Sequence, residues 1–209
     1  MRKVLYSIII YTCACLCACN GVRKADPPKE QYTLGLFIDS CLESYPSYNN
    51  NAVTRSILAD TLKNRLQKYR GKHLTYLDDL PFQYEMCLEY PKTFDFVDDA
   101  NAGKYVVKFG FSDSYLKNEL SDKYEYEATF QVFTVMDKEK VAMLVDDSLY
   151  HIKGIFRDFA NNTKETGFAL PSGKFFVDYP SVGVTSLGDT FMCLGTLILD
   201  SLTFTKIQQ

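Results

Sequence analysis

The sequence predicts an α+β fold that is mostly β, with helices near the N-terminus followed by antiparallel strands. Two observations favour this class. Apolar residues have helical spacing up to Gly71 and alternate every second residue beyond it. The chain also holds 15 Tyr and 15 Phe but no Trp, and aromatic rings pack well on a pleated sheet. With 46% hydrophobic and 23% charged residues, the 209-residue chain is typical of one folded domain with a short appendage.

Residues 1–18 have the layout of a secretory signal peptide. Met1-Arg2-Lys3 gives a positive start, and an almost unbroken apolar run extends from Val4 to Ala18. The run of about 15 apolar residues falls short of the roughly 20 that a membrane-spanning helix needs. An uncleaved apolar N-terminal helix is the alternative.

The end of this run contains four of the seven cysteines, Cys13, Cys15, Cys17 and Cys19. Leu16-Cys17-Ala18-Cys19 resembles the lipobox of bacterial lipoproteins, in which a small residue precedes the lipid-bearing cysteine. The resemblance implies cleavage before Cys19 and acylation of Cys19 with fatty acids such as palmitate. It also implies localisation in the cell envelope of a Gram-negative bacterium, with a lipid anchor in the outer membrane and the domain facing the periplasm or the surface.

Beyond Cys19 we expect a tether and then a single domain. Residues 19–30 are polar and contain Pro27-Pro28, as suits a tether. Residues 31–209 form the domain, whose first part, 31–71, is predicted to be helical. Residues 32–45 fit both a helical stripe and strand alternation, and we favour the helix.

A second helix is predicted from the N-cap Asn51 to Gly71, a glycine suited to the left-handed position after a helix. One face of this helix would carry the apolar residues Val53, Ile57, Leu58, Leu62, Leu66 and Tyr69.

The β part of the domain spans residues 72–209 and holds three clearly alternating segments, 82–90, 105–111 and 126–132. Each is typical of a half-buried strand. Residues 138–147 fit a short helix or a further strand. Two more strands are predicted at 149–159 and 197–207, separated by a loop-rich insertion at 160–193.

This order of elements resembles an OB-fold, a five-stranded Greek-key barrel. More narrowly, Tyr69-Arg70-Gly71-Lys72-His73-Leu74 and Ser148-Leu149-Tyr150-His151-Ile152-Lys153-Gly154 look like the tRNA-anticodon-binding-like OB-fold family found among secreted bacterial lipoproteins. The resemblance implies a helix followed by an OB-like five-stranded antiparallel barrel. A β-sandwich is the alternative, because Asp78-Asp79-Leu80-Pro81 stands where the family has a glycine and the insertion is long.

The outer face of the first three strands is predicted to be solvated, with opposite charges paired across neighbouring strands. It would display Glu85, Cys87, Glu89, Lys104, Val106, Lys108, Glu125, Glu127, Thr129 and Gln131. This face has no row of aromatic rings for base stacking, and the chain carries a net charge of −3. We therefore do not expect nucleic acid as a partner.

Few residues point to catalysis. His73 and His151 lie in no metal-binding pattern, and Gly183 to Gly188 has Val184 where a serine nucleophile turn needs glycine. We expect no catalytic residue, no metal and no cofactor, although a Cys87–His151 dyad is conceivable. If the first and last strands adjoin, Cys87 and Cys193 are the expected disulfide, with Cys41 left as a free thiol.

Function is therefore predicted at the level of class. We expect a lipid-anchored, non-enzymatic binding or interaction module for an envelope protein, peptide or glycan. The alternatives are an envelope hydrolase with a pocket at the barrel mouth and a structural assembly subunit. The candidate ligand contacts are aromatic residues in predicted loops, namely Tyr115, Phe168, Phe175, Phe176 and Tyr179.

Overall fold

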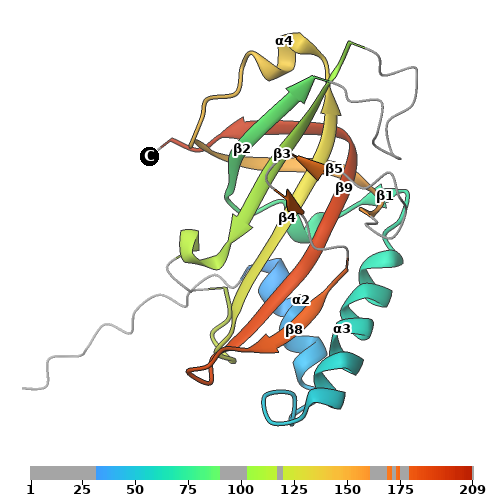
Figure 1. The fold of residues 1–209 in the computed structure, drawn as a ribbon, viewed down its shortest axis with the longest axis vertical. Helices are drawn as coiled ribbons and strands as arrows, with labels where there is room; N and C mark the ends of the chain where they lie inside the picture. The colour runs from blue at the N-terminus through green and yellow to red at the C-terminus, as the bar shows by residue number, and fades with distance from the viewer. Residues whose placement is uncertain are drawn as a thin grey trace, which may run out of the picture. The chain divides into compact units, whose positions relative to one another are not determined.

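The computed structural model describes residues 32–89, 103–116, 120–160 and 179–208, and the backbone of residues 169–170 and 173–174. The chain divides into two compact units, Met1–Glu30 and Gln31–Gln209, and all described residues belong to the second. The predicted leader, the tether and Cys19 thus lie outside the described residues. The second unit is mixed α/β and mostly β (Figure 1), which confirms the predicted class. Within the described ranges, no helix is both long and apolar enough to cross a membrane.

The first described helix, α2 (Thr33–Leu42), confirms the helix favoured for residues 32–45. Leu34, Ile38 and Leu42 recur at every fourth residue and are all buried. The buried positions therefore follow the helical period and not the strand alternation.

The second helix, α3 (Ala52–Gln67), begins where the sequence predicts. The side-chain oxygen of Asn51 accepts hydrogen bonds from the backbone N–H groups of Val53 (2.9 Å) and Thr54 (3.3 Å), as an N-cap does. The apolar stripe is only partly buried, however. Val53 and Ile57 are 68% and 46% exposed, whereas Leu58 and Leu62 of the same stripe are fully buried.

After α3 the chain turns to Gly71, whose φ of +74° is the left-handed conformation expected there. The last residue of α3 is Gln67, four residues before Gly71, so the helix ends earlier than a C′ position at Gly71 predicts. The N–H of Gly71 donates to the carbonyl oxygen of Phe156 (2.7 Å), and the chain continues into the short strand β1 (Lys72–His73).

The three alternating segments form β2 (Phe82–Glu89), β3 (Tyr105–Ser112) and β4 (Glu127–Met136), which pair antiparallel in chain order as predicted. Short 3-10 helices, η1 (Thr75–Leu77) and η3 (Asp113–Leu116), precede β2 and follow β3. The segment 138–147 begins with a short helix, α4 (Lys138–Val141), and β5 (Leu149–Phe159) occupies its predicted range.

The predicted loop-rich insertion 160–193 contains more regular structure than expected. β6 (Ala169–Leu170) and β7 (Gly173–Lys174) pair with each other, and β8 (Ser181–Val184) pairs with β9 (Thr190–Lys206). β9 therefore begins seven residues before the predicted start at position 197. The first half of β9 was missed because the strand has a bulge where it pairs with β4. The bulge interrupts the alternation of apolar and polar residues along β9.

The main sheet has seven strands in the order β1-β5-β2-β3-β4-β9-β8, and β5 pairs in addition with β9. Five strands thus form a closed circuit of pairings, from β5 through β2, β3, β4 and β9 back to β5. The prediction that all five strands pair antiparallel was wrong for one pair, because β4 and β9 run parallel, whereas the other pairs of the main sheet are antiparallel.

The core is rich in aromatic rings from both halves of the sheet. Phe82, Phe109, Phe130, Tyr150 and Phe156 are fully buried, and the rings of Phe82 and Phe130 meet edge to face with centroids 5.4 Å apart. Figure 1 shows α2 and α3 at the end of the sheet where β8 lies, and α4 at the opposite end.

Candidate functional site

The candidate functional site is a cavity of about 340 Å³ on the outer face of β3, β4 and β9. The strand register places its floor in two cross-strand rows. One row runs through Gly110, Gln131 and Thr196, and the other through Ser112, Thr129, Cys193 and Ser181. Residues opposite each other in such rows project to the same side of a sheet. These two rows therefore contribute hydroxyl, amide and thiol groups to a cavity whose lining also includes the rings of Phe111, Phe130 and Phe191.

At one edge of the cavity lies an ion pair between β2 and β3. Lys108 Nζ is 2.5 Å from Glu85 Oε2, and the Lys108 residue is only 6% exposed. The pair has room because position 110 is glycine: a Cβ atom there would lie 1.8 Å from Glu85 Oε1. Pairing compensates the charge of a buried ammonium, which would otherwise be costly. The charge of the Glu85 carboxylate, which lines the cavity, is therefore compensated by Lys108.

The sequence predicted a solvated outer face with cross-strand charge pairs. The Glu85–Lys108 pair confirms the pairing. The prediction that this face is exposed to solvent was wrong for Val106 and Lys108, because both residues are buried. Alternation along a strand tells which residues share a face, but it does not tell whether that face is covered.

Tyr115 is the predicted ligand contact that lines the cavity. It comes from η3, directly after β3, and its hydroxyl donates to Gln83 Oε1 at 2.6 Å. Gln83 Nε2 in turn donates to Asp147 Oδ1 at 3.1 Å. Burial, with a smaller contribution from the nearby Glu85 charge, raises the pKa of Tyr115, so its hydroxyl stays a hydrogen-bond donor.

The far wall of the cavity is made by the bulge in β9. Gly195 has a φ of +83°, which allows the strand to shift its register against β4. Thr196 follows it in the cavity lining and is fully buried. Its Oγ1 atom has no hydrogen-bond partner among the described residues. A buried hydroxyl without a partner is costly, and this one belongs to a residue of the cavity lining.

Cys193 also lines the cavity, as a free thiol rather than in the expected disulfide with Cys87. The disulfide required the first and last strands to adjoin. Instead β2 pairs with β3 and β5, whereas β9 pairs with β4, β5 and β8. Burial raises the pKa of the Cys193 thiol, which keeps it protonated and a poor nucleophile. Cys41 is a buried free thiol as well.

The other predicted contacts lie elsewhere. Tyr179 packs its ring against Phe159, with centroids 5.7 Å apart, and Lys63 Nζ lies 3.5 Å from the ring centroid. Tyr179 is thus held against the body of the domain and is not part of the cavity lining. The remaining candidates, Phe168, Phe175 and Phe176, lie outside the described residues.

The two histidines make local contacts. His73 Nε2 lies 2.9 Å from Asp78 Oδ1, and His151 Nδ1 donates to the carbonyl oxygen of Leu80 at 3.2 Å. Neither histidine lines the cavity. In the part of the chain that the structure describes, no group of three or more His, Cys, Asp or Glu side chains is placed to hold a metal ion.

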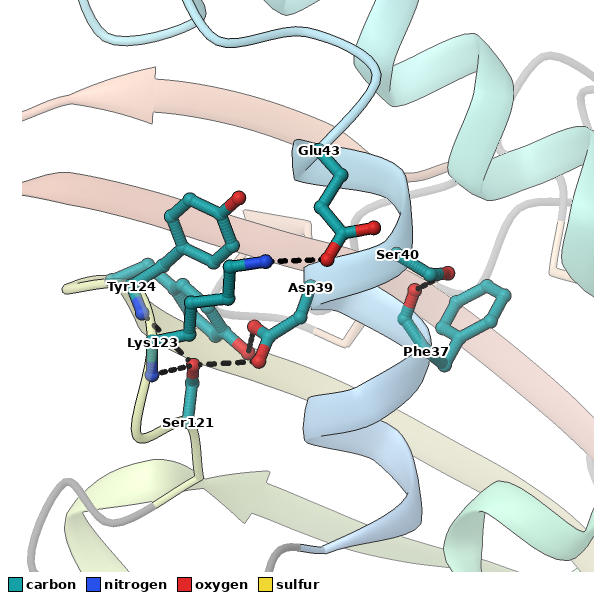
Figure 2. A network of polar contacts seen from close by, with 8 residues as sticks. Phe37, Asp39, Ser40, Glu43, Ser121, Lys123 and Tyr124 are labelled. Atoms are coloured by element: carbon teal, nitrogen blue, oxygen red, sulfur yellow. Dashed lines mark hydrogen bonds and ion pairs between the residues drawn. The ribbon is translucent and has the colours of Figure 1, made fainter.

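A polar network on α2 fixes the loop that leads into β4 (Figure 2). Asp39 is buried, and its carboxylate accepts hydrogen bonds from Ser121 Oγ (2.9 Å) and Tyr126 Oη (3.3 Å). Ser121 Oγ also accepts from the backbone N–H groups of Lys123 and Tyr124, each at 3.1 Å. Burial and the charge of Asp39 raise the pKa of Tyr126, so its hydroxyl remains a donor. The network positions the start of β4.

A second buried carboxylate, Asp113, lies where β3 ends and is 1% exposed. Its Oδ2 accepts the backbone N–H of Ala128 at 3.1 Å, and its Oδ1 has no hydrogen-bond partner among the described residues. Burial raises the pKa of Asp113 from 3.8 to about 6, against the opposing effect of the Ala128 hydrogen bond. The folded domain thus favours the protonated form of Asp113, because burial penalises the charge by more than the Ala128 hydrogen bond stabilises it.

Sequence reasoning found Tyr115 but missed Thr196, Gly110 and the buried carboxylates. Asp39 offered one signal, since it is a charged residue between Ile38 and Cys41 on a mostly apolar helix. Gly110 and Thr196 offered none, because small residues in strands have many roles. Comparison with protein-family models, with curated proteins and with solved structures finds no match to the chain.

Proposed function

We propose that this chain is a lipid-anchored cell-envelope lipoprotein whose β-rich domain is a non-enzymatic binding module. The anchoring part rests on Leu16-Cys17-Ala18-Cys19 and the apolar run before it. With acyl chains on Cys19, the domain would be held at the outer membrane by the tether 19–30.

We also propose that the strand circuit is an OB-like barrel. The support is that five strands pair in a ring and that α4 lies between β4 and β5, the third and fourth strands of that ring in chain order. A β-sandwich would need two stacked sheets and would leave more strand edges open. The outer face that carries the cavity is the face on which OB-folds commonly bind ligands.

The cavity is the observation that carries the binding function. Its volume of about 340 Å³ lies at the lower end of the range for small-molecule sites, which run from about 300 to 1,000 Å³. Tyr115 and Phe191 supply ring surface, and Gln131 and Thr196 supply hydrogen-bonding groups. Because Glu85 is neutralised by Lys108, the lining favours an uncharged polar group such as part of a glycan or a peptide.

Binding can be tested with a pair of matched threonine variants. Thr196→Val removes the unpartnered hydroxyl in the cavity, and Thr134→Val removes another buried, unpartnered hydroxyl that does not line it. Both variants should melt at the same temperature as the wild type or slightly above it, since each loses an unsatisfied polar group. Titration with panels of neutral glycans and short peptides should show weaker binding only for Thr196→Val. Equal affinities in the two variants would refute the cavity as the binding site.

Anchoring can be tested independently by feeding cells labelled palmitate. Wild-type protein and Cys15→Ala should incorporate the label, because Cys15 lies inside the proposed leader. Cys19→Ala should not incorporate it. Label on Cys19→Ala would refute the lipoprotein assignment and leave the binding proposal untouched.

A further inference from the structure

A second concave surface lies away from the outer sheet face, between α2, the end of α3 and η1. It is a groove of about 680 Å³. From α2 it is lined by Thr33, Leu36, Phe37 and Ser40, which are spaced as one face of a helix. None of its lining residues belongs to the cavity on β3, β4 and β9.

The floor of the groove is apolar and aromatic. Leu36 is 53% exposed, and Phe37 beside it is buried. The ring of Tyr76 lies 4.5 Å from that of Phe37 and 5.0 Å from that of Tyr69, centroid to centroid. Tyr69 and Tyr76 hold each other through a 2.8 Å hydrogen bond between their hydroxyls. The floor is therefore a fixed apolar surface.

One end of the groove is basic. Arg65 Nη1 donates to Ser40 Oγ at 2.8 Å, and Lys68 follows one turn later on α3. Neither side chain has a carboxylate partner among the described residues, and no described carboxylate lines the groove. The nearby carboxylate of Asp79 accepts hydrogen bonds from Thr33. Thr33 lies about 10 Å along α2 from Ser40, given the helical rise of 1.5 Å per residue. The positive charge is thus concentrated at the Ser40 end.

We propose that this groove binds one molecule of an anionic phospholipid. Its phosphate would accept hydrogen bonds from Arg65 and Lys68, since a guanidinium matches phosphate geometry and Arg65 has donors beyond the one given to Ser40. An acyl chain would cover Leu36 and the ring of Tyr76. An apolar floor with a cationic end complements an amphiphile with an anionic head. The net charge of −3 disfavours general adhesion to anionic surfaces, so attraction of an anionic lipid would be local to Arg65 and Lys68.

The test uses the full chain reconstituted in phosphatidylcholine vesicles, with short-chain dihexanoyl-phosphatidylglycerol added below its micellar concentration. The melting temperature of the far-ultraviolet circular dichroism signal should rise with added lipid, and its concentration dependence yields an affinity. Dihexanoyl-phosphatidylcholine and inorganic phosphate should give no such rise at equal concentration. An equal rise with phosphate alone would identify a free-anion site and overturn the lipid proposal.

Three variants locate the effect. Arg65→Gln and Leu36→Ser should each weaken binding about tenfold, the first by removing charge and the second by removing apolar contact. Lys63→Gln is the matched control, because Lys63 lies on the same helix but faces Tyr179. A loss of affinity in Lys63→Gln equal to that in Arg65→Gln would show general charge attraction and refute the groove. Melting temperatures without lipid establish that each variant folds. If Arg65→Gln does not fold, Lys68→Gln, at an exposed position, takes its place.

Discussion

The buried carboxyl of Asp113 makes the stability of this domain depend on pH in a defined way. Because the pKa of Asp113 is about 6 when folded and 3.8 when unfolded, the folded state binds the proton more tightly. At pH below 3.8 both states are protonated and the contribution to stability is complete. As pH rises from 3.8 through 6 the unfolded state ionises first, and the contribution is lost.

The size of this loss follows from the two pKa values. A rise from 3.8 to about 6 corresponds to roughly 3 kcal/mol of unfolding free energy between pH 3 and pH 8. Asp113→Asn carries no charge at any pH and keeps an oxygen to accept the Ala128 N–H. The free energy of unfolding of this variant, relative to the wild type, should therefore increase by about 2 to 3 kcal/mol over that pH range. Any cost of the new NH₂ group is the same at every pH and cancels.

Urea unfolding at pH 3.5, 5 and 8 measures this difference. Because the chain has 15 Tyr and no Trp, circular dichroism or tyrosine emission is the suitable signal. Asp122→Asn, at an exposed position in the loop before β4, is the control and should follow the wild type at each pH. If Asp113→Asn also runs parallel to the wild type from pH 3.5 to 8, Asp113 does not titrate as a buried group and the reasoning fails.

Two further substitutions test other contacts. Gly110→Ala should lower the unfolding free energy by about 2 kcal/mol, because the new methyl group displaces Glu85 from Lys108, and urea unfolding would detect this; unchanged stability would show that the pair adapts. Asn51→Ala should cost about 1 kcal/mol through loss of the α3 N-cap, whereas Asn50→Ala, whose side chain makes no cap, should cost little; equal costs would contradict the capping role.

Several elements could be predicted from the sequence because their signals are local. The cap at Asn51, the helical recurrence through Leu62 and the alternation of β2 to β4 depend on residues close together in the chain. The misses have equally specific causes. β1 and β8 are two and four residues long, too short to show a period. In β9 the bulge at Gly195 moves the inward-facing residues from even to odd positions, so its two halves do not read as one strand.

The candidate site was predictable only in part. Tyr115 could be singled out as an aromatic residue in a predicted loop, and it lines the cavity. Tyr179 had the same signal but packs against Phe159. The Cys87–Cys193 disulfide was inferred from an assumed neighbourhood of first and last strands, which the pairing of β9 with β4 and β5 does not provide. Such pairings join residues far apart in sequence, and no local pattern encodes them.

For the two long helices and for β2 to β5, the sequence by itself determined which side chains share a face, and hence these elements and the mostly β class. The sequence also contains the leader and lipobox pattern, which depends on the order of the residues and not on the fold. Only the tertiary structure decided what lies over each face: that Lys108 is buried, that Thr196 lacks a partner among the described residues, and that Arg65 stands at the end of an apolar groove. The physical reason is that direction is a property of a few consecutive residues, whereas burial depends on which distant segments the chain brings together.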